Sequence, residues 1–333
     1  MLSRVLYSIF VNGFAKALNE SGVGGVEVGG EVLRLLLFAD DIVLFAETAE
    51  ELQKMLDVLE EYSRKWRFEI NVKKSKGMVC GPQREKEDEG RVWKFGEGVM
   101  ESVDEYKYVG VMVDREGSWD AAVARALDKG REETTKMKGW LGKHWGVSPR
   151  VKVEVWKGMV GSVMRYGSEV WFPMVVGTRD LEAVQLGWVK SVLRLNGGTT
   201  DEFVRGEVGL FELKRERDKS MLVWLGRLEM MSEDRWSRRV YDVEWNVVGK
   251  QRKSWKTKVG ELVRGYNLVE EFGKLRKEGN IKEWKKVVKD AVREVAVDEW
   301  EDGVRRGKKL GLYRELMVGG LKNIWKECMG RER

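Results

Sequence analysis

Two adjacent carboxylates, Asp40 and Asp41, separate two apolar runs of strand length, Val32–Phe38 and Ile42–Phe45. This pattern predicts a strand, an acidic turn and a second strand. A divalent cation would offset the repulsion between the two charges, since Mg²⁺ takes one or two carboxylate ligands and fills its other positions with water and phosphate oxygens. Taken alone, such a tetrapeptide is more often a plain acidic hairpin turn. The context of the pair therefore decides between a turn and a metal site.

The histidine and cysteine content limits the kinds of catalytic and metal-binding site that the chain can form. A single histidine, His144, argues against a Ser-His-Asp triad, a zinc-binding HExxH helix or a His-ligated iron, because each needs imidazole as base or ligand. The two cysteines, Cys80 and Cys328, are far apart and have no Cys or His neighbours, so no zinc site or disulfide framework can be written. Catalysis would then have to rest on carboxylates and lysines.

The positive charge of the chain lies towards its C-terminus. Residues 246–333 contain 23 Lys and Arg against 14 Asp and Glu, a surplus of nine, so residues 1–245 carry a net charge of −3. A cluster around Trp255 has the composition of a phosphate-backbone contact, and a solvated helix face explains it equally well. The basic residues of this cluster are Lys250, Arg252, Lys253, Lys256 and Lys258.

No apolar run approaches the length of a membrane span, since the run Leu35–Ala39 is ended by the acidic pair. The first residues imitate a signal peptide, with Ala15-Lys16-Ala17 as a cleavage site, but Asn12 interrupts the apolar stretch. Their apolar spacing favours instead a helix packed on a core. We therefore expect no membrane partner and an intracellular location, in the nucleus or the cytoplasm, without secretion.

Local signals place further elements after the acidic pair. Thr48 and Glu51 form a capping box, which predicts a helix over Ala49–Trp66. Short strands are expected at Phe68–Val72 and Met78–Cys80, separated by a basic turn. A last strand is expected at Tyr106–Asp114, and helices follow at 119–145, 148–166, 178–195 and 212–231.

Four segments follow one another in a recognisable order. They are Phe38-Ala39-Asp40-Asp41, Ile70-Asn71-Val72-Lys73-Lys74-Ser75, Tyr106-Lys107-Tyr108-Val109-Gly110 and Tyr166-Gly167-Ser168-Glu169-Val170-Trp171. This order resembles the reverse transcriptases of LINE-type (non-LTR) retrotransposons. The first three segments look like their catalytic motif C, motif D and the primer-grip hairpin, motif E, and the fourth like an element beyond the polymerase. Arg205–Gly209 and Leu222–Leu228 are similar to the region after that, so the resemblance covers roughly residues 1–231.

The resemblance implies an α+β fold, in which a partial right-hand polymerase palm of antiparallel β-hairpins and helices precedes a mostly α-helical thumb and C-terminal region. The second half of the palm would be residues 1–115. A helical thumb and connection region would follow at 116–245, and a basic helical C-terminal region at 246–333.

The resemblance also implies roles for individual residues. Asp40 would hold a metal ion, and Asp41 would support the same metal site. Lys74 would lie near the phosphates of the incoming nucleotide and donate a proton to pyrophosphate, with simple solvation as the equally weighted alternative. The segment Tyr106–Gly110 could be a primer grip or, as the alternative, a hairpin of the protein core. The residues expected to hold the primer terminus are Tyr106, Tyr108 and Gly110.

The chain also departs from the family pattern. Family members carry a first catalytic aspartate well upstream of motif C, whereas here only Glu20, Glu27 and Glu31 precede Asp40 as acidic residues. Leu2-Ser3-Arg4 looks like the tail of motif B, with arginine in place of the usual proline. We therefore expect a fragment or a degenerate copy of a longer element, which binds Mg²⁺ (or Mn²⁺) weakly and does not polymerise alone.

The resemblance implies an RNA template and a DNA primer as the partners of the parent family. Two function classes follow. The first is a reverse transcriptase (RNA-directed DNA polymerase) fragment with two-metal nucleotidyl-transfer chemistry. The second is a non-catalytic nucleic-acid-binding or scaffold protein derived from it, which uses the basic C-terminal region.

Overall fold

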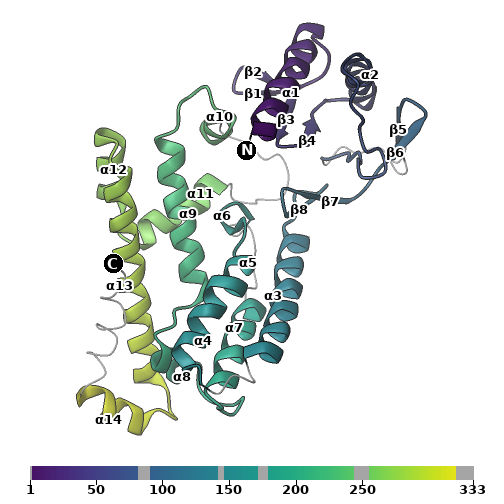
Figure 1. The fold of residues 1–333 in the computed structure, drawn as a ribbon. Coiled ribbons are helices and arrows are strands. Elements are labelled where there is room, and N and C mark those ends of the chain that lie inside the picture. Colours follow the sequence, from purple (N-terminus) through teal and green to yellow (C-terminus); the bar gives the residue numbers. More distant parts are fainter. Residues whose placement is uncertain (1, 82–90, 142–145, 172–178, 244–254, 320–333) are drawn as a thin grey trace. The chain divides into compact units, whose positions relative to one another are not determined.

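The computed structural model describes residues 2–81, 91–141, 146–171, 179–243 and 255–319 (Figure 1). The chain forms two compact units: the first contains residues 1–118 and 231–246, and the second contains residues 119–230 and 247–333. The first unit mixes helices with short antiparallel hairpins, and the described part of the second is helical. This mixture agrees with the predicted α+β class.

Every named strand of the described residues belongs to a two-stranded antiparallel hairpin. The pairs are β1 (Val26–Val28) with β2 (Glu31–Leu33), β3 (Leu35–Phe38) with β4 (Asp41–Leu44), β5 (Val92–Phe95) with β6 (Gly98–Glu101), and β7 (Glu105–Tyr108) with β8 (Val111–Asp114). The β1–β2 loop is Gly29-Gly30, both with positive φ, as two-residue hairpin loops require. The strand predicted over Val32–Phe38 is thus divided between two hairpins at Arg34.

Helices α1 (Leu2–Ser21) and α2 (Ala49–Trp66) pack against each other and supply most of the core of the first unit. Phe14, Leu18 and Met55 are fully buried, and the hydroxyl of Tyr62 donates a 3.0 Å hydrogen bond to the carbonyl of Phe10. Apolar burial of this kind stabilises by about 25 cal/mol per Å² removed from water. The packing fixes α1 beside the hairpins, and helix α10 (Trp236–Asp242) joins this unit through an Arg239–Glu31 ion pair of 3.3 Å.

The prediction for α2 is confirmed. Thr48 caps the helix by accepting from the backbone N–H of Glu51 at 3.2 Å, and the carboxylate of Glu51 accepts from the N–H of Glu47. The helix ends where Arg67 adopts a left-handed φ of 57°, so that its N–H reaches the carbonyl of Ser63.

The strands predicted at Phe68–Val72 and Met78–Cys80 are wrong. Asn71 closes a turn there, because its carbonyl and side-chain oxygen both accept from the N–H of Lys74. Next to this turn, Gly77 forms an isolated bridge with Ser102. The β5–β6 hairpin, which the sequence did not predict, buries Trp93 beside α2.

Helices make up the described part of the second unit, and helices are found near the four predicted ranges 119–145, 148–166, 178–195 and 212–231. Their bounds are α3 (Asp120–Leu141), α4 (Pro149–Trp156), a π-helical turn (Lys157–Gly161), α5 (Ser162–Met164), α6 (Ser168–Trp171), α7 (Arg179–Val192), α8 (Asp201–Val208), α9 (Leu213–Glu229), α11 (Trp255–Gly265), α12 (Val269–Glu278), α13 (Ile281–Arg306) and α14 (Gly311–Gly319). Ser148 caps α4 with Pro149 in its first turn, as predicted. The segment 142–145 of the first predicted helix lies outside the described residues.

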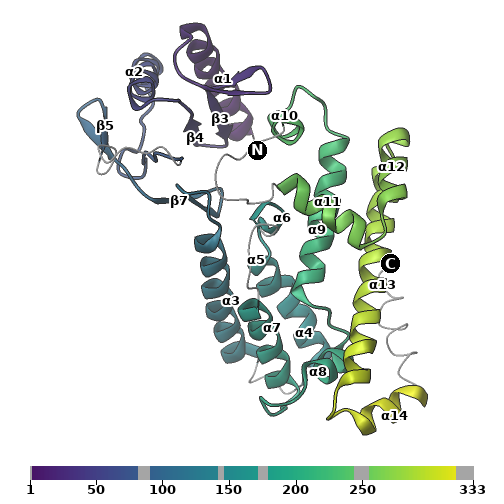
Figure 2. The same cartoon turned by 180° about the vertical axis from the view of Figure 1, so that it is seen from behind.

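The long helix α13 runs beside α9 in both views (Figures 1 and 2), and a glycine of α9 makes their close approach possible. The indole N–H of Trp284 donates to the carbonyl of Leu222 at 2.8 Å, and a Cβ at Gly226 would lie 2.3 Å from the same indole. A Cβ at Gly206 on α8 would similarly meet the Tyr313 hydroxyl at 2.2 Å. Residues 255–315 are therefore an integral part of the helical unit.

The segment that resembles the Tyr-Gly-x-Glu-x-Trp element forms a corner between α5 and α6. Gly167 has a φ of 69°, and Trp171 is buried with its indole N–H donating to the carbonyl of Tyr166 at 3.1 Å. The backbone of Glu169 accepts from the indole of Trp255 at 2.8 Å. None of the described helices has the length and apolar character needed to cross a membrane.

Candidate active site

The acidic pair lies at the tip of the β3–β4 hairpin. Phe38 pairs with Asp41, which leaves Ala39 and Asp40 as the two loop residues. Ala39 has a φ of 51°, and a positive φ at the first loop position alone is the pattern of a type II′ turn, which prefers glycine. A non-glycine residue held in such a sparsely populated backbone region costs about 1–3 kcal/mol. Backbone strain of this kind clusters at functional sites, which makes the tip a candidate site.

Asp40 and Asp41 are both exposed to solvent. They are adjacent in sequence, and hard oxygen donors of this type suit Mg²⁺. Among the residues that the structure describes, no third His, Cys, Asp or Glu joins them to form a metal-binding group. The pair therefore fits one or two ligand positions of a divalent ion, with the other positions left for water and phosphate.

The predicted primer-grip segment forms the β7–β8 hairpin. Its loop is Val109-Gly110, with φ values of 45° and 86°, as in a type I′ turn. A β-branched residue in this region is a marked outlier, so Val109 is held there against its own preference. Gly110 is the residue type that the second loop position requires.

Tyr108 connects this hairpin to the acidic pair. Partial burial raises the pKa of Tyr108 above its usual value, and the Asp41 carboxylate raises it further because a nearby negative charge disfavours the phenolate. Tyr106 and Tyr108 are two residues apart on β7 and so point to the same side of the strand.

Tyr106 connects the hairpin to the basic turn. Its hydroxyl donates to the carbonyl of Lys74 at 3.2 Å. The backbone N–H of Lys74 in turn donates to the side-chain oxygen of Asn71. The amine of Lys74 is exposed and has no ion-pair partner within the described segments. The structure therefore brings the backbone of Lys74 to the aromatic hairpin, while its amine remains available to a ligand.

The predicted basic cluster is only partly described. Lys250, Arg252 and Lys253 lie outside the described residues. Lys256 and Lys258 lie in the first turns of α11, in the helical unit, whereas the acidic pair belongs to the other unit.

Sequence reasoning did not single out Asn71 or Val109 as contributors to this site. Asn71 carried a usable signal, since asparagine bonds to the backbone of its own turn. Val109 carried none, because valine is the residue type least expected in a left-handed loop position.

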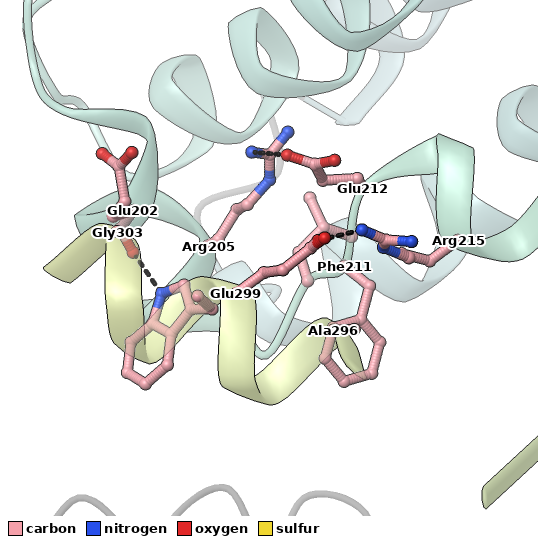
Figure 3. Close-up of a pocket in the computed structure, with 10 residues that line it drawn as sticks. Glu202, Arg205, Phe211, Glu212, Arg215, Ala296, Glu299 and Gly303 are labelled. Atoms are coloured by element: carbon pink, nitrogen blue, oxygen red, sulfur yellow. Dashed lines mark hydrogen bonds and ion pairs between the residues drawn. The ribbon is translucent and has the colours of Figure 1, made fainter. Parts of the chain in front are cut away.

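A second candidate is a cavity of about 70 Å³ in the helical unit, between α8, α9 and α13 (Figure 3). Its arginines are paired: Arg205 with Glu182 at 3.1 Å and with Glu212 at 3.3 Å, and Arg215 with Glu299. Because the charges of these arginines are compensated by neighbouring carboxylates, the cavity is a structural ion-pair network rather than a ligand site.

Next to this cavity, a buried network links α9 to the segment between α11 and α12. The hydroxyl of Tyr266 donates to Asp218 at 2.5 Å and accepts from Arg215 at 2.6 Å. Burial raises the pKa of Asp218 and lowers that of Arg217 to about 10. Of these groups, Arg215 also lines the cavity of Figure 3, and its hydrogen bond to Tyr266 links α9 to the segment between α11 and α12.

Comparison with known proteins shows what the chain is similar to. Residues 1–113, which hold both the acidic hairpin and the aromatic hairpin, match the family model "Reverse transcriptase (RNA-dependent DNA polymerase)". A stretch of 203 residues, 59% of the chain, is 29% identical to the RNA-directed DNA polymerase from mobile element jockey of Drosophila funebris. The chain spans 21% of that relative's length. The resemblance to LINE-type (non-LTR) retrotransposon reverse transcriptases is thereby confirmed.

Proposed function

We propose that the first unit is the second half of a reverse transcriptase palm, in which Asp40 and Asp41 bind the catalytic Mg²⁺. The supporting observation is spatial. The Asp41 carboxylate raises the pKa of Tyr108, and the Tyr106 hydroxyl donates to the carbonyl of Lys74. The acidic hairpin, the aromatic hairpin and the basic turn, which are separated in sequence, therefore meet at one place. Two hairpin loops with strained, non-glycine residues frame that place.

In this proposal each segment has a task in nucleotidyl transfer. The bound Mg²⁺ ions would stabilise the negative charge on the attacking and leaving oxygens. Asp40 and Asp41 supply oxygen ligands, and the exposed amine of Lys74 delivers a positive charge, or a proton, to the departing pyrophosphate. The strand face of Tyr106 and Tyr108 supports the primer terminus of an RNA-templated DNA primer.

The domain boundaries belong to the same proposal. Residues 1–115 are the palm portion, 116–245 the helical thumb and connection region, and 246–333 a basic helical C-terminal region. Mn²⁺ is expected to substitute for Mg²⁺, because both accept carboxylate, carbonyl and water oxygens.

We further propose that a polypeptide of these 333 residues does not polymerise by itself. Two metal ions need more carboxylates than one adjacent pair supplies, and no aspartate precedes Asp40. Primer extension on an RNA template with Mg²⁺ or Mn²⁺ tests this, and we expect no product. A fusion of this chain to the segment upstream of the matching region in the jockey polymerase would supply the missing aspartate and is expected to extend the primer.

The controls separate the two claims. Template-dependent extension by the chain alone, abolished in Asp40→Ala, would overturn the inactivity claim. Extension by the fusion that survives Asp40→Ala would overturn the site assignment. Glu97→Gln is the matched control, since Glu97 is also an exposed acid at a two-residue hairpin loop, between β5 and β6.

A second candidate function is nucleic-acid binding without catalysis, favoured by the surplus of nine positive charges after residue 246. Because residues 255–315 pack into the helical unit, deleting them would disturb the fold. The better test is Lys256→Gln combined with Lys258→Gln. Unchanged oligonucleotide affinity and unchanged salt dependence in this variant would argue against a role for the described part of the cluster.

A further inference from the structure

The basic turn, residues 71–77, carries three lysines whose surroundings differ. The amine of Lys76 is paired with the carboxylate of Glu101 at 2.8 Å. Lys73 and Lys74 are exposed, and the amine of neither has an ion-pair partner within the described residues. Charge and exposure alone therefore do not distinguish Lys73 from Lys74 as the lysine that meets a ligand.

The backbone distinguishes these two lysines. The N–H of Lys74 donates to two oxygens of Asn71, the carbonyl at 3.0 Å and the side-chain oxygen at 3.2 Å. The carbonyl of Lys74 accepts from the hydroxyl of Tyr106 at 3.2 Å. The backbone of Lys73 makes no hydrogen bond with any residue that the structure describes. Of the two, Lys74 is therefore the lysine whose backbone is held at both of its polar groups.

The turn is attached to the aromatic hairpin at a second point. The N–H of Gly77 donates to the carbonyl of Glu101 at 3.0 Å, and the carbonyl of Gly77 accepts from the N–H of Val103 at 3.0 Å. Val103 comes two residues before β7, the strand that carries Tyr106. The turn is thus fixed to the hairpin at Lys74 and again at Gly77.

This restraint affects how readily each lysine can bind an anion. A lysine amine is a point charge on a flexible four-carbon stem, and binding must order both that stem and the backbone that carries it. In Lys74 the backbone is already ordered in the free protein, whereas in Lys73 it is not held. Preorganisation strengthens binding by removing part of the entropic cost, so an anion beside the turn should prefer Lys74.

We propose that Asn71 and Tyr106 are positioning residues, which hold the backbone of Lys74 so that its amine, rather than that of Lys73, contacts the phosphate oxygens of pyrophosphate. This role rests on the proposed function of the first unit, in which pyrophosphate departs beside Lys74. The hydroxyl of Tyr106 is engaged by the turn, so its ring is the part that is left for a primer.

The test is acetylation of the full chain by N-hydroxysuccinimidyl acetate at increasing concentrations of inorganic pyrophosphate, at a low Mg²⁺ concentration that keeps magnesium pyrophosphate in solution. Tandem mass spectrometry after Glu-C digestion measures acetylation of Lys73 and Lys74 separately, so Lys73 is the control within each molecule. In the parent we expect pyrophosphate to protect Lys74 in the millimolar range, and Lys73 only at concentrations about tenfold higher.

Three variants test the two positioning residues. Tyr106→Phe removes only the hydroxyl, and Asn71→Ala removes the side-chain acceptor; each should raise the pyrophosphate concentration that half-protects Lys74 about threefold. Asn71→Ser differs from Asn71→Ala by one oxygen, which can accept from the backbone of the turn, and should stay within about twofold of the parent. Protection of Lys73 should be unchanged in all three. A merely structural role would instead lower the melting temperature or change both lysines together.

Several results would overturn the proposal. They are equal protection of the two lysines in the parent, protection of neither, and parent-like protection of Lys74 in both Tyr106→Phe and Asn71→Ala. An equal loss in Asn71→Ala and Asn71→Ser would overturn the role of the Asn71 side-chain oxygen.

Failure of the proposed metal site gives a different result. If the acidic hairpin does not bind the ion, Asp40→Asn combined with Asp41→Asn should protect Lys74 as the parent does, and the effects of Tyr106→Phe and Asn71→Ala should persist. If the positioning role fails while the metal site holds, the double variant should lose the protection that Tyr106→Phe and Asn71→Ala keep.

Discussion

Replacing Gly226 with alanine tests the packing of α9 on α13. The added Cβ would lie 2.3 and 2.4 Å from two atoms of the Trp284 indole, and 3.1 Å from Ile281. Alanine gains about 1 kcal/mol of helix propensity over glycine. Overpacking costs about 1–3 kcal/mol, and losing the bond from Trp284 to the carbonyl of Leu222 costs about 1 kcal/mol more. The net expectation is a loss of about 1–3 kcal/mol.

A matched substitution should have the opposite sign. Gly187 on α7 has no atom within 4 Å of an added Cβ, so Gly187→Ala should stabilise by about 0.5–1 kcal/mol. Urea unfolding followed by circular dichroism at 222 nm measures both variants. Gly226→Ala combined with Trp284→Phe should lose less than the sum of the single changes, because the two residues are in contact. If Gly226→Ala stabilises as much as Gly187→Ala, the assigned contact between α9 and α13 is wrong.

Three further variants test the two units. Tyr266→Phe removes a buried hydroxyl that bonds to Asp218 and should lower the free energy of unfolding by about 2–3 kcal/mol in urea. Asp40→Asn should leave the melting temperature unchanged or slightly raised, because the residue is exposed and loses only a like-charge repulsion. Asp41→Asn should lower the pKa of Tyr108 towards its usual value, because removal of a nearby negative charge favours the phenolate; ¹³Cζ-tyrosine NMR titration measures it.

A different result would refute each of these three predictions. A Tyr266→Phe protein as stable as the parent would mean that the buried bonds contribute nothing. A clear loss of stability in Asp40→Asn would reveal a structural partner for that carboxylate. An unchanged Tyr108 titration in Asp41→Asn, with Glu97→Gln as control, would separate the acidic hairpin from the aromatic one.

Local signals in the sequence predicted the elements that depend on neighbouring residues. Thr48 and Glu51 marked the start of α2, and Ser148 with Pro149 marked that of α4. The apolar runs around Asp40 became the β3–β4 hairpin. These features were accessible because caps and hairpin turns are formed within a few residues of the chain.

The errors in predicting secondary structure also have local physical causes. Phe68–Val72 has the composition of a strand, but the turn closed by Asn71 prevents a ladder. The β5–β6 hairpin alternates over only four residues per strand, and a two-residue loop that begins with Gly96 gave too weak a signal.

Contacts between distant segments were beyond sequence reasoning. Gly206 and Gly226 lie within helices and are contact points for aromatic side chains 58–107 positions later, such as Trp284 and Tyr313. In the candidate site, the order of motifs was enough to predict which residues belong to it. The electrostatic effect of Asp41 on Tyr108 could not be predicted, because it depends on how the two hairpins are placed by the fold.

The function proposed for the first unit requires that the Asp40–Asp41 hairpin bind a divalent metal ion. Electron paramagnetic resonance of free Mn²⁺, titrated with the 333-residue chain, measures this directly. We expect binding in the millimolar range, because one adjacent pair supplies few ligands and the ion keeps most of its water. Binding should disappear in Asp40→Asn with Asp41→Asn and persist in Glu97→Gln. Equal Mn²⁺ binding by the parent and the double variant would show that the hairpin is not the metal site.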